Sequence, residues 1–148
     1  MVKVSFNADR QKSKLFKYNI EEKIEENLLI IIFSGEMSEG ANSIINQCQR
    51  EINSKDRYKD KDIKYVILDF NEVTLLNEEI IGSIRGLQSA IRKKNALIRV
   101  CCLRPEWKKM FFDEDIFHKD EIGEGRSTTI DGLKSKMKKD DLYCNSHL

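Results

Sequence analysis

The sequence lacks a long hydrophobic run and an excess of charge of either sign. Its longest apolar run, Leu28 to Phe33, is far too short to span a bilayer. The first residues, Met1 to Lys14, are polar and do not form a signal peptide. A formal net charge of +1 gives no general attraction to nucleic acid or to an anionic membrane. We therefore expect a cytoplasmic protein that binds neither nucleic acid nor membranes.

The sequence also lacks the usual spacings of metal, cofactor and catalytic sites. It has no C-x-x-C pair and no Walker-type or G-x-G-x-x-G motif, and His118 and His147 stand alone. Cys101 and Cys102 are neighbours in a predicted strand. We therefore expect their side chains to point to opposite faces and not to bind one metal together. These absences predict buried, reduced thiols, no metal, no cofactor and no enzymatic activity.

Length and composition are those of one soluble globular domain. Of the 148 residues, 40% are hydrophobic and 34% are charged, so a sizeable core can lie under a densely charged surface. We divide the chain into an N-terminal extension (1–14), a main domain (15–139) and a flexible tail (140–148). The extension contains an alternating stretch, Val2 to Phe6, that is compatible with an extra strand.

The most informative stretch lies between Lys64 and Leu103. Residues 65–70 are apolar and β-branched, as in a strand covered on both faces, and residues 97–103 have the same character. Between them the spacing of the apolar residues predicts an amphipathic helix. Its apolar stripe is formed by Ile80, Ile84, Leu87 and Ile91. Strand, helix and strand form a parallel βαβ unit, in which functional residues are expected at the strand-to-helix turn.

The flanking segments complete the fold. Residues 16–24 alternate in polarity and are expected to pair as a hairpin with the buried strand 28–33. A helix with the stripe Ile44, Ile45, Cys48 and Ile52 follows. After the βαβ unit we expect a short helix from Pro105, an edge strand at 116–118 and a final helix capped by Ser127 or Thr128. The order predicts an α/β fold with a mixed sheet of four to five strands and about four helices mainly on one face.

The element order and the residues at the strand-to-helix turn resemble the STAS domain, the fold of bacterial anti-sigma-factor antagonists. In that family an apolar strand ends in Asp, and an Asp-Ser-Ser-Gly-Leu-Gly type motif then opens the next helix. Here Asp69 ends the matching strand, and residues 77–82 (Asn-Glu-Glu-Ile-Ile-Gly) match the motif. Gly35 matches the glycine that commonly ends the second strand. The resemblance covers roughly residues 15–138.

The resemblance implies an interaction module rather than an enzyme, with one important departure. In partner-switching members, the serine after the motif's Asp is phosphorylated by a kinase that is also the anti-sigma factor. The unphosphorylated form binds that kinase and frees the sigma factor. Glu78 stands at the serine position here, and Asn77 replaces the Asp. A carboxylate cannot accept phosphate, and its charge of about −1 only partly mimics the roughly −1.5 to −2 of phosphoserine.

The same turn also fits ordinary helix-start chemistry. Asn77 is a good N-cap, and the carboxylates of Glu78 and Glu79 each favour the positive end of a helix by about 0.3–1 kcal/mol. Both interpretations stay open, and they do not exclude one another.

The family resemblance also implies which residues surround the turn. The partner-binding surface would include residues 35–38, with Ser38, and residues 71–74, with Asn71 and Thr74, beside Asp69. The expected partner is a protein, either an anti-sigma factor or a Ser/Thr kinase.

Two other functions stay open. The first is a scaffold or sensor subunit of a stress-signalling assembly, which would form homo-oligomers and be modified at another hydroxyl such as Thr74 or Ser83. The second is a domain that binds a small ligand, as some STAS-like domains do.

Overall fold

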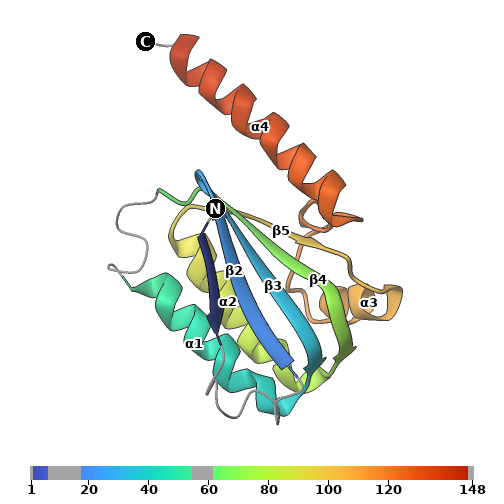
Figure 1. Ribbon diagram of the computed structural model, residues 1–148. Coiled ribbons are helices and arrows are strands. Elements are labelled where there is room, and N and C mark those ends of the chain that lie inside the picture. Colours follow the sequence, from blue (N-terminus) through green and yellow to red (C-terminus); the bar gives the residue numbers. More distant parts are fainter. Residues whose placement is uncertain (1, 7–17, 55–61, 147–148) are drawn as a thin grey trace.

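The computed structural model describes residues 2–6, 18–54 and 62–146, with side chains for 18–54 and 62–136. One five-stranded sheet runs through it in the order β1-β2-β3-β4-β5 (Figure 1). The strands are β1 (Val2–Phe6), β2 (Tyr18–Glu25), β3 (Leu28–Met37), β4 (Tyr65–Leu76) and β5 (Leu97–Cys101). The first three are antiparallel neighbours, whereas β3, β4 and β5 are parallel. The sheet is therefore mixed, as the sequence predicted.

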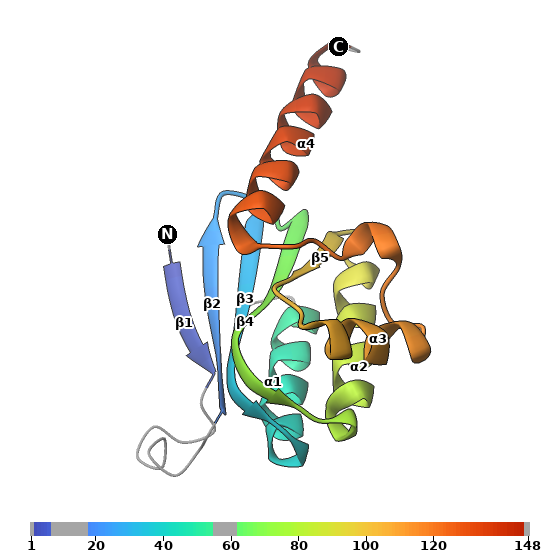
Figure 2. The same cartoon turned by 90° about the vertical axis from the view of Figure 1, so that its right-hand side faces the viewer.

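Three helices cover one face of the sheet, and a fourth begins on the other (Figure 2). The first three are α1 (Asn42–Asn53), α2 (Ile81–Lys93) and α3 (Pro105–Asp113). Their apolar side chains share the larger core with residues such as Phe33 and Leu68. The fourth, α4 (Arg126–Ser146), places Leu133 against the opposite face of β3 and β4, and its far end projects beyond the sheet (Figure 1).

The apolar stripes predicted for α1 and α2 are the faces that these helices bury. Ile80, Ile84, Leu87 and Ile91 are all buried against the sheet. The stripe of α1 is buried in the same core. The α/β class and the placement of most helices on one face are therefore confirmed, because a period between three and four puts these residues on one side of each helix.

Two predicted elements differ from the structure. Residues 116–118 form no strand. Phe117 instead packs edge-on against Phe111 at 5.3 Å, so its apolar character serves the core below α3. Instead, Ile122 pairs with Val100 of β5 in an isolated parallel β-bridge. The final helix also begins at Arg126, directly after Gly125, so neither Ser127 nor Thr128 lies at its N-cap.

The structure also describes elements near the two ends of the chain. Val2–Phe6 does form a strand and pairs with β2, so this part of the predicted extension belongs to the sheet. At the other end α4 continues to Ser146, past the boundary predicted at residue 139.

Candidate interaction surface

The strand-to-helix turn lies where β3 and β4 end side by side. Both strands run further than predicted, because each supplies the other's hydrogen-bond partners as far as Met37 and Leu76. Gly35, at a register shift in β3, has a φ of 82°, a backbone conformation that favours glycine. The backbone N–H of Asn77 then donates to the carbonyl of Met37 at 3.0 Å. The two chain segments that leave the sheet are thus held together.

Short 3-10 turns open the two helices that follow these strands. They are η2 (Glu39–Ala41) before α1 and η3 (Glu78–Ile80) before α2. The Asn42 amide links them, since its Nδ2 donates to the Glu79 carbonyl at 3.4 Å. Its Oδ1 accepts a hydrogen bond of 2.7 Å from the Ser83 hydroxyl. The N-terminal ends of α1 and α2, which are far apart in the sequence, therefore lie side by side and form one edge of the domain.

Several of the predicted site residues meet on this edge, which we call the interaction surface. It comprises Ser38, Thr74, Asn77, Glu78 and Glu79, and Leu75 lies at its margin near the end of β4. Both glutamates and Thr74 are exposed, while Ser38 and Asn77 are partly buried. Asn77 occupies the N-cap position of η3, but its side chain makes no capping hydrogen bond. The helix-start interpretation therefore accounts for the positions of Asn77, Glu78 and Glu79. It does not account for the Asn77 side-chain amide, which does not cap the turn.

Leu75, at the margin of this surface, is an exposed residue that the sequence analysis missed. It is 47% exposed, although it lies beside the buried Leu76 and pairs with Glu36 on β3. Neighbouring residues of a strand point to opposite faces, so one of two adjacent leucines at a strand end is expected to face outward. That signal was available, but only if β4 had been extended to residue 76.

Asp69 does not belong to the interaction surface. Its side chain is only 1% exposed and lies on the sheet face that α4 covers. One oxygen, Oδ1, accepts the backbone N–H of Asn71 at 2.9 Å, and the other, Oδ2, lies 3.3 Å from Nε of Arg126. Asn71 is exposed but is tied to this buried carboxylate. The predicted site is therefore divided, with Asp69 on the opposite side of the sheet from the helix starts.

The two neighbouring cysteines also differ from their prediction. Cys101 ends β5, and Cys102 has a φ of 66°, so the strict alternation of a strand does not apply to Cys102. One ligand atom each of Asp69, Cys101 and Cys102 lies within 4.8 Å of the others. Burial, and next the charge of Asp69, raises the pKa of the Cys101 thiol. Burial likewise raises the pKa of the Cys102 thiol, so both are protonated at neutral pH.

A comparison with protein families matches the STAS domain to residues 13–128. This chain belongs to the STAS domain family. The match spans the sheet from β2 to β5 and the helices α1 to α3, and it ends just inside α4. The family assignment made from the strand-to-helix turn is thereby confirmed.

Solved structures support the same fold. The anti-sigma factor antagonist SpoIIAA in its unphosphorylated form gives a TM-score of 0.61 at 13% identity, covering 78% of this chain and 96% of that one. The phosphorylated form of the Bacillus cell fate determinant SpoIIAA gives 0.59 at 13%, with coverages of 77% and 98%. SLC26A9 gives 0.59 at 11%, covering 80% of this chain but only 21% of SLC26A9. No curated protein matches this sequence. At these identities, the similarity establishes the fold.

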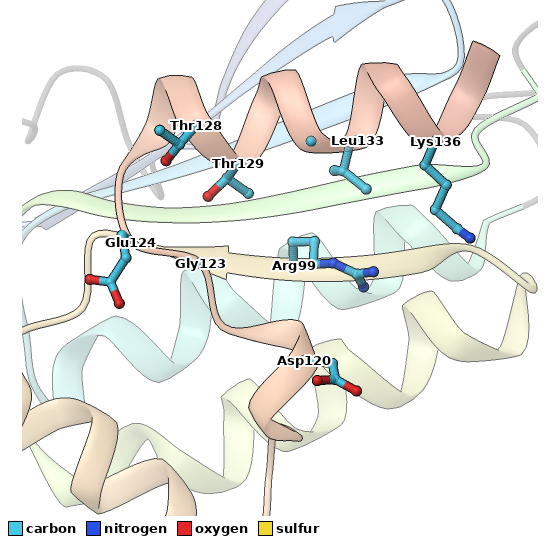
Figure 3. A pocket seen from close by; sticks show the side chains of 9 residues that line it. Arg99, Asp120, Gly123, Glu124, Thr128, Thr129, Leu133 and Lys136 are labelled. Atoms are coloured by element: carbon cyan, nitrogen blue, oxygen red, sulfur yellow. The ribbon is translucent and has the colours of Figure 1, made fainter. Parts of the chain in front are cut away.

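A separate cavity lies between this STAS domain's α4 and β5. Its volume is about 470 Å³. Figure 3 shows Lys136 reaching from α4 toward β5, where Arg99 lies, with Asp120 and Glu124 at its other edges. Two cationic side chains from different elements thus line one hollow. Among the described residues, none of the helices has the length and hydrophobicity needed to cross a membrane.

Proposed function

We propose that this STAS domain is a non-catalytic interaction module of bacterial signal transduction, similar to an anti-sigma-factor antagonist but not switched at the usual serine. The observation that carries the proposal is the interaction surface itself. A half-exposed leucine lies next to two exposed carboxylates. The resemblance of residues 77–82 to the family's motif assigns Glu78 to the serine position, and that assignment is part of the proposal. The proposed partner is an anti-sigma factor of the Ser/Thr kinase type, and the proposed location is the cytoplasm.

The chemistry of the surface supports binding rather than turnover. Glu78 and Glu79 are both exposed to solvent, and the sequence from residue 49 to residue 100 contains no histidine or cysteine that could act with them as base or nucleophile. An apolar side chain next to charged ones is instead a common composition at the centre and rim of a protein interface. Thr74 is exposed, whereas the Ser83 hydroxyl is already bonded to Asn42, so Thr74 is the more accessible hydroxyl for a kinase.

The half-exposed side chain of Leu75 gives the first test, because a partner that covers it would remove apolar surface from water. Leu75→Ala is expected to weaken binding to an anti-sigma-type kinase from the same organism by about 2 kcal/mol, roughly 30-fold, as for an interface hot spot. Isothermal titration calorimetry measures the dissociation constant directly. Leu97→Ala is the matched control, because Leu97 is similarly exposed, at 37%, but lies at the opposite end of the parallel strands. If Leu75→Ala and Leu97→Ala bind the kinase as tightly as the wild type, the proposed surface is wrong.

The cavity beside α4 favours a second candidate function, the binding of a small anionic ligand. Arg99 and Lys136 would bind the anionic group, and Leu133 would contact an apolar part. Native mass spectrometry of the freshly purified protein is expected to show a bound mass that Arg99→Ala loses. The absence of any bound mass, or its persistence in Arg99→Ala, would contradict this candidate.

A further inference from the structure

Three potential metal ligands meet on the sheet face opposite the α1–α2 layer. Asp69 of β4 and Cys101 of β5 are direct partners in the parallel register, so the sheet itself places them side by side. Cys102 follows immediately, and one ligand atom of each residue lies within 4.8 Å of the others. Asp69 and Cys101 are fully buried, whereas Cys102 is partly exposed and offers access from solvent.

The backbone fixes Cys102 in this arrangement. Its φ of 66° lies in the left-handed region, which non-glycine residues seldom adopt. Its N–H donates to the carbonyl of Glu124 at 2.9 Å, so this turn is tied to the loop that leads into α4. The bond to Glu124 and the left-handed backbone together hold the Cys102 side chain near Asp69 and Cys101.

The buried carboxylate adds a second observation. Within the described part of the chain, Oδ2 of Asp69 accepts no hydrogen bond, and it lies 3.3 Å from Nε of Arg126. This oxygen therefore has an ion pair with Arg126 but accepts no hydrogen bond, and it lies beside two thiols, so its lone pairs are available to a metal ion.

We propose that Asp69, Cys101 and Cys102 bind one closed-shell cation of the zinc class. Sulfur and carboxylate ligands suit Zn²⁺, whereas Ca²⁺ and Mg²⁺ require oxygen ligands throughout. Ligands about 2.0–2.3 Å from a tetrahedral ion lie roughly 3.3–3.8 Å apart, so the cluster needs to contract by about 1 Å or more where its atoms are 4.8 Å apart. Each thiol releases its proton to solvent on binding. Water would occupy the fourth position.

The charge of the loaded site is matched by its surroundings. Two thiolates and one carboxylate outweigh a divalent cation by one negative charge. The guanidinium of Arg126, already beside Asp69, supplies the compensating positive charge. Because Arg126 is also the first residue of α4, occupation of the site would stabilise the start of that helix.

Cadmium is a suitable probe, because its bonds to thiolates give an ultraviolet charge-transfer band. The full chain, reduced and freed of metal, is titrated with Cd²⁺, and a chromophoric chelator gives the affinity for Zn²⁺. We expect saturation at one equivalent of Cd²⁺ and an absorbance that corresponds to two thiolates. Cys102→Ser and Asp69→Asn should each weaken Zn²⁺ binding at least about tenfold.

The other two cysteines provide the control. Cys48→Ser combined with Cys144→Ser should leave the stoichiometry and the affinity unchanged, because Cys48 lies in the α1 core and Cys144 near the chain end. Circular dichroism of each variant checks that it folds, and the partly exposed Cys102 is the position where folding should be least affected. Lack of saturable binding by the wild type would overturn the proposal. Binding that survives in Cys102→Ser with unchanged charge-transfer absorbance would overturn it equally.

Discussion

Replacing Ile84 with aspartate is expected to lower the free energy of unfolding by roughly 4 kcal/mol or more, since the change removes a buried side chain and buries an unpaired charge. Ile84 is completely buried where α2 packs on the sheet. Its neighbours in that core are apolar, so the new carboxylate would have no counter-ion there. Urea denaturation followed by circular dichroism gives the free energy of unfolding for the variant and the wild type.

Ser89→Asp is the matched control for this substitution. Ser89 lies on the same helix but is exposed, so the same carboxylate remains hydrated there. Ser89→Asp should lower the free energy of unfolding by no more than about 0.5–1 kcal/mol. This figure includes the repulsion between the new carboxylate and the negative C-terminal end of the helix dipole. Similar losses in Ile84→Asp and Ser89→Asp would mean that the α2–sheet contact is not the core contact described here.

Much of the fold could be predicted because its periodicities are strong. The stripe from Ile80 to Ile91 faces the sheet, and the fully apolar segment 28–33 forms a strand covered on both faces. Strand lengths were harder to predict. Residues 71–76 are mostly polar or exposed, and their pairing with β3, with the burial of Val73 and Leu76, keeps them in the sheet. Such pairing depends on distant residues and leaves no periodic signal in the strand itself.

The candidate site was predictable only in part, for a similar reason. Glu78 and Glu79 lie in the first turn before α2, where local sequence chemistry places them. Whether Asp69 faces the same way depends on the strand's alternation across the sheet, and it faces α4 instead. The Cys102 side chain lies near Asp69 because the backbone of Cys102 is left-handed just after β5. The alternation of residues in a strand does not predict such a conformation.

Glu78→Ser is expected to convert this STAS domain into a kinase substrate and to tighten its binding to an anti-sigma-type kinase. The variant introduces a hydroxyl at an exposed position of the interaction surface and removes a fixed negative charge. If the carboxylate acts as a partial phosphate mimic, removing it relieves the repulsion that phosphoserine would impose. We expect the dissociation constant to fall by about tenfold, which corresponds to about 1.4 kcal/mol.

Glu78→Gln separates the two effects of that substitution. Glutamine keeps nearly the size of glutamate but has neither its charge nor a hydroxyl. The glutamine variant should therefore bind the kinase more tightly than the wild type and still accept no phosphate. Equal affinities of the wild type, Glu78→Gln and Glu78→Ser would leave Glu78 as a helix-start residue without a role in partner binding.

The most direct measurement is the phosphorylation of residues 77–82 after incubation with ATP and an anti-sigma-type kinase from the same organism. Mass spectrometry of the digested protein locates and quantifies the phosphate. We expect no phosphate in this segment of the wild type or of Glu78→Gln, and stoichiometric phosphate at residue 78 of Glu78→Ser. A Glu78→Ser protein that binds the kinase and remains unmodified at residue 78 would contradict the assignment of this position to the family's switch.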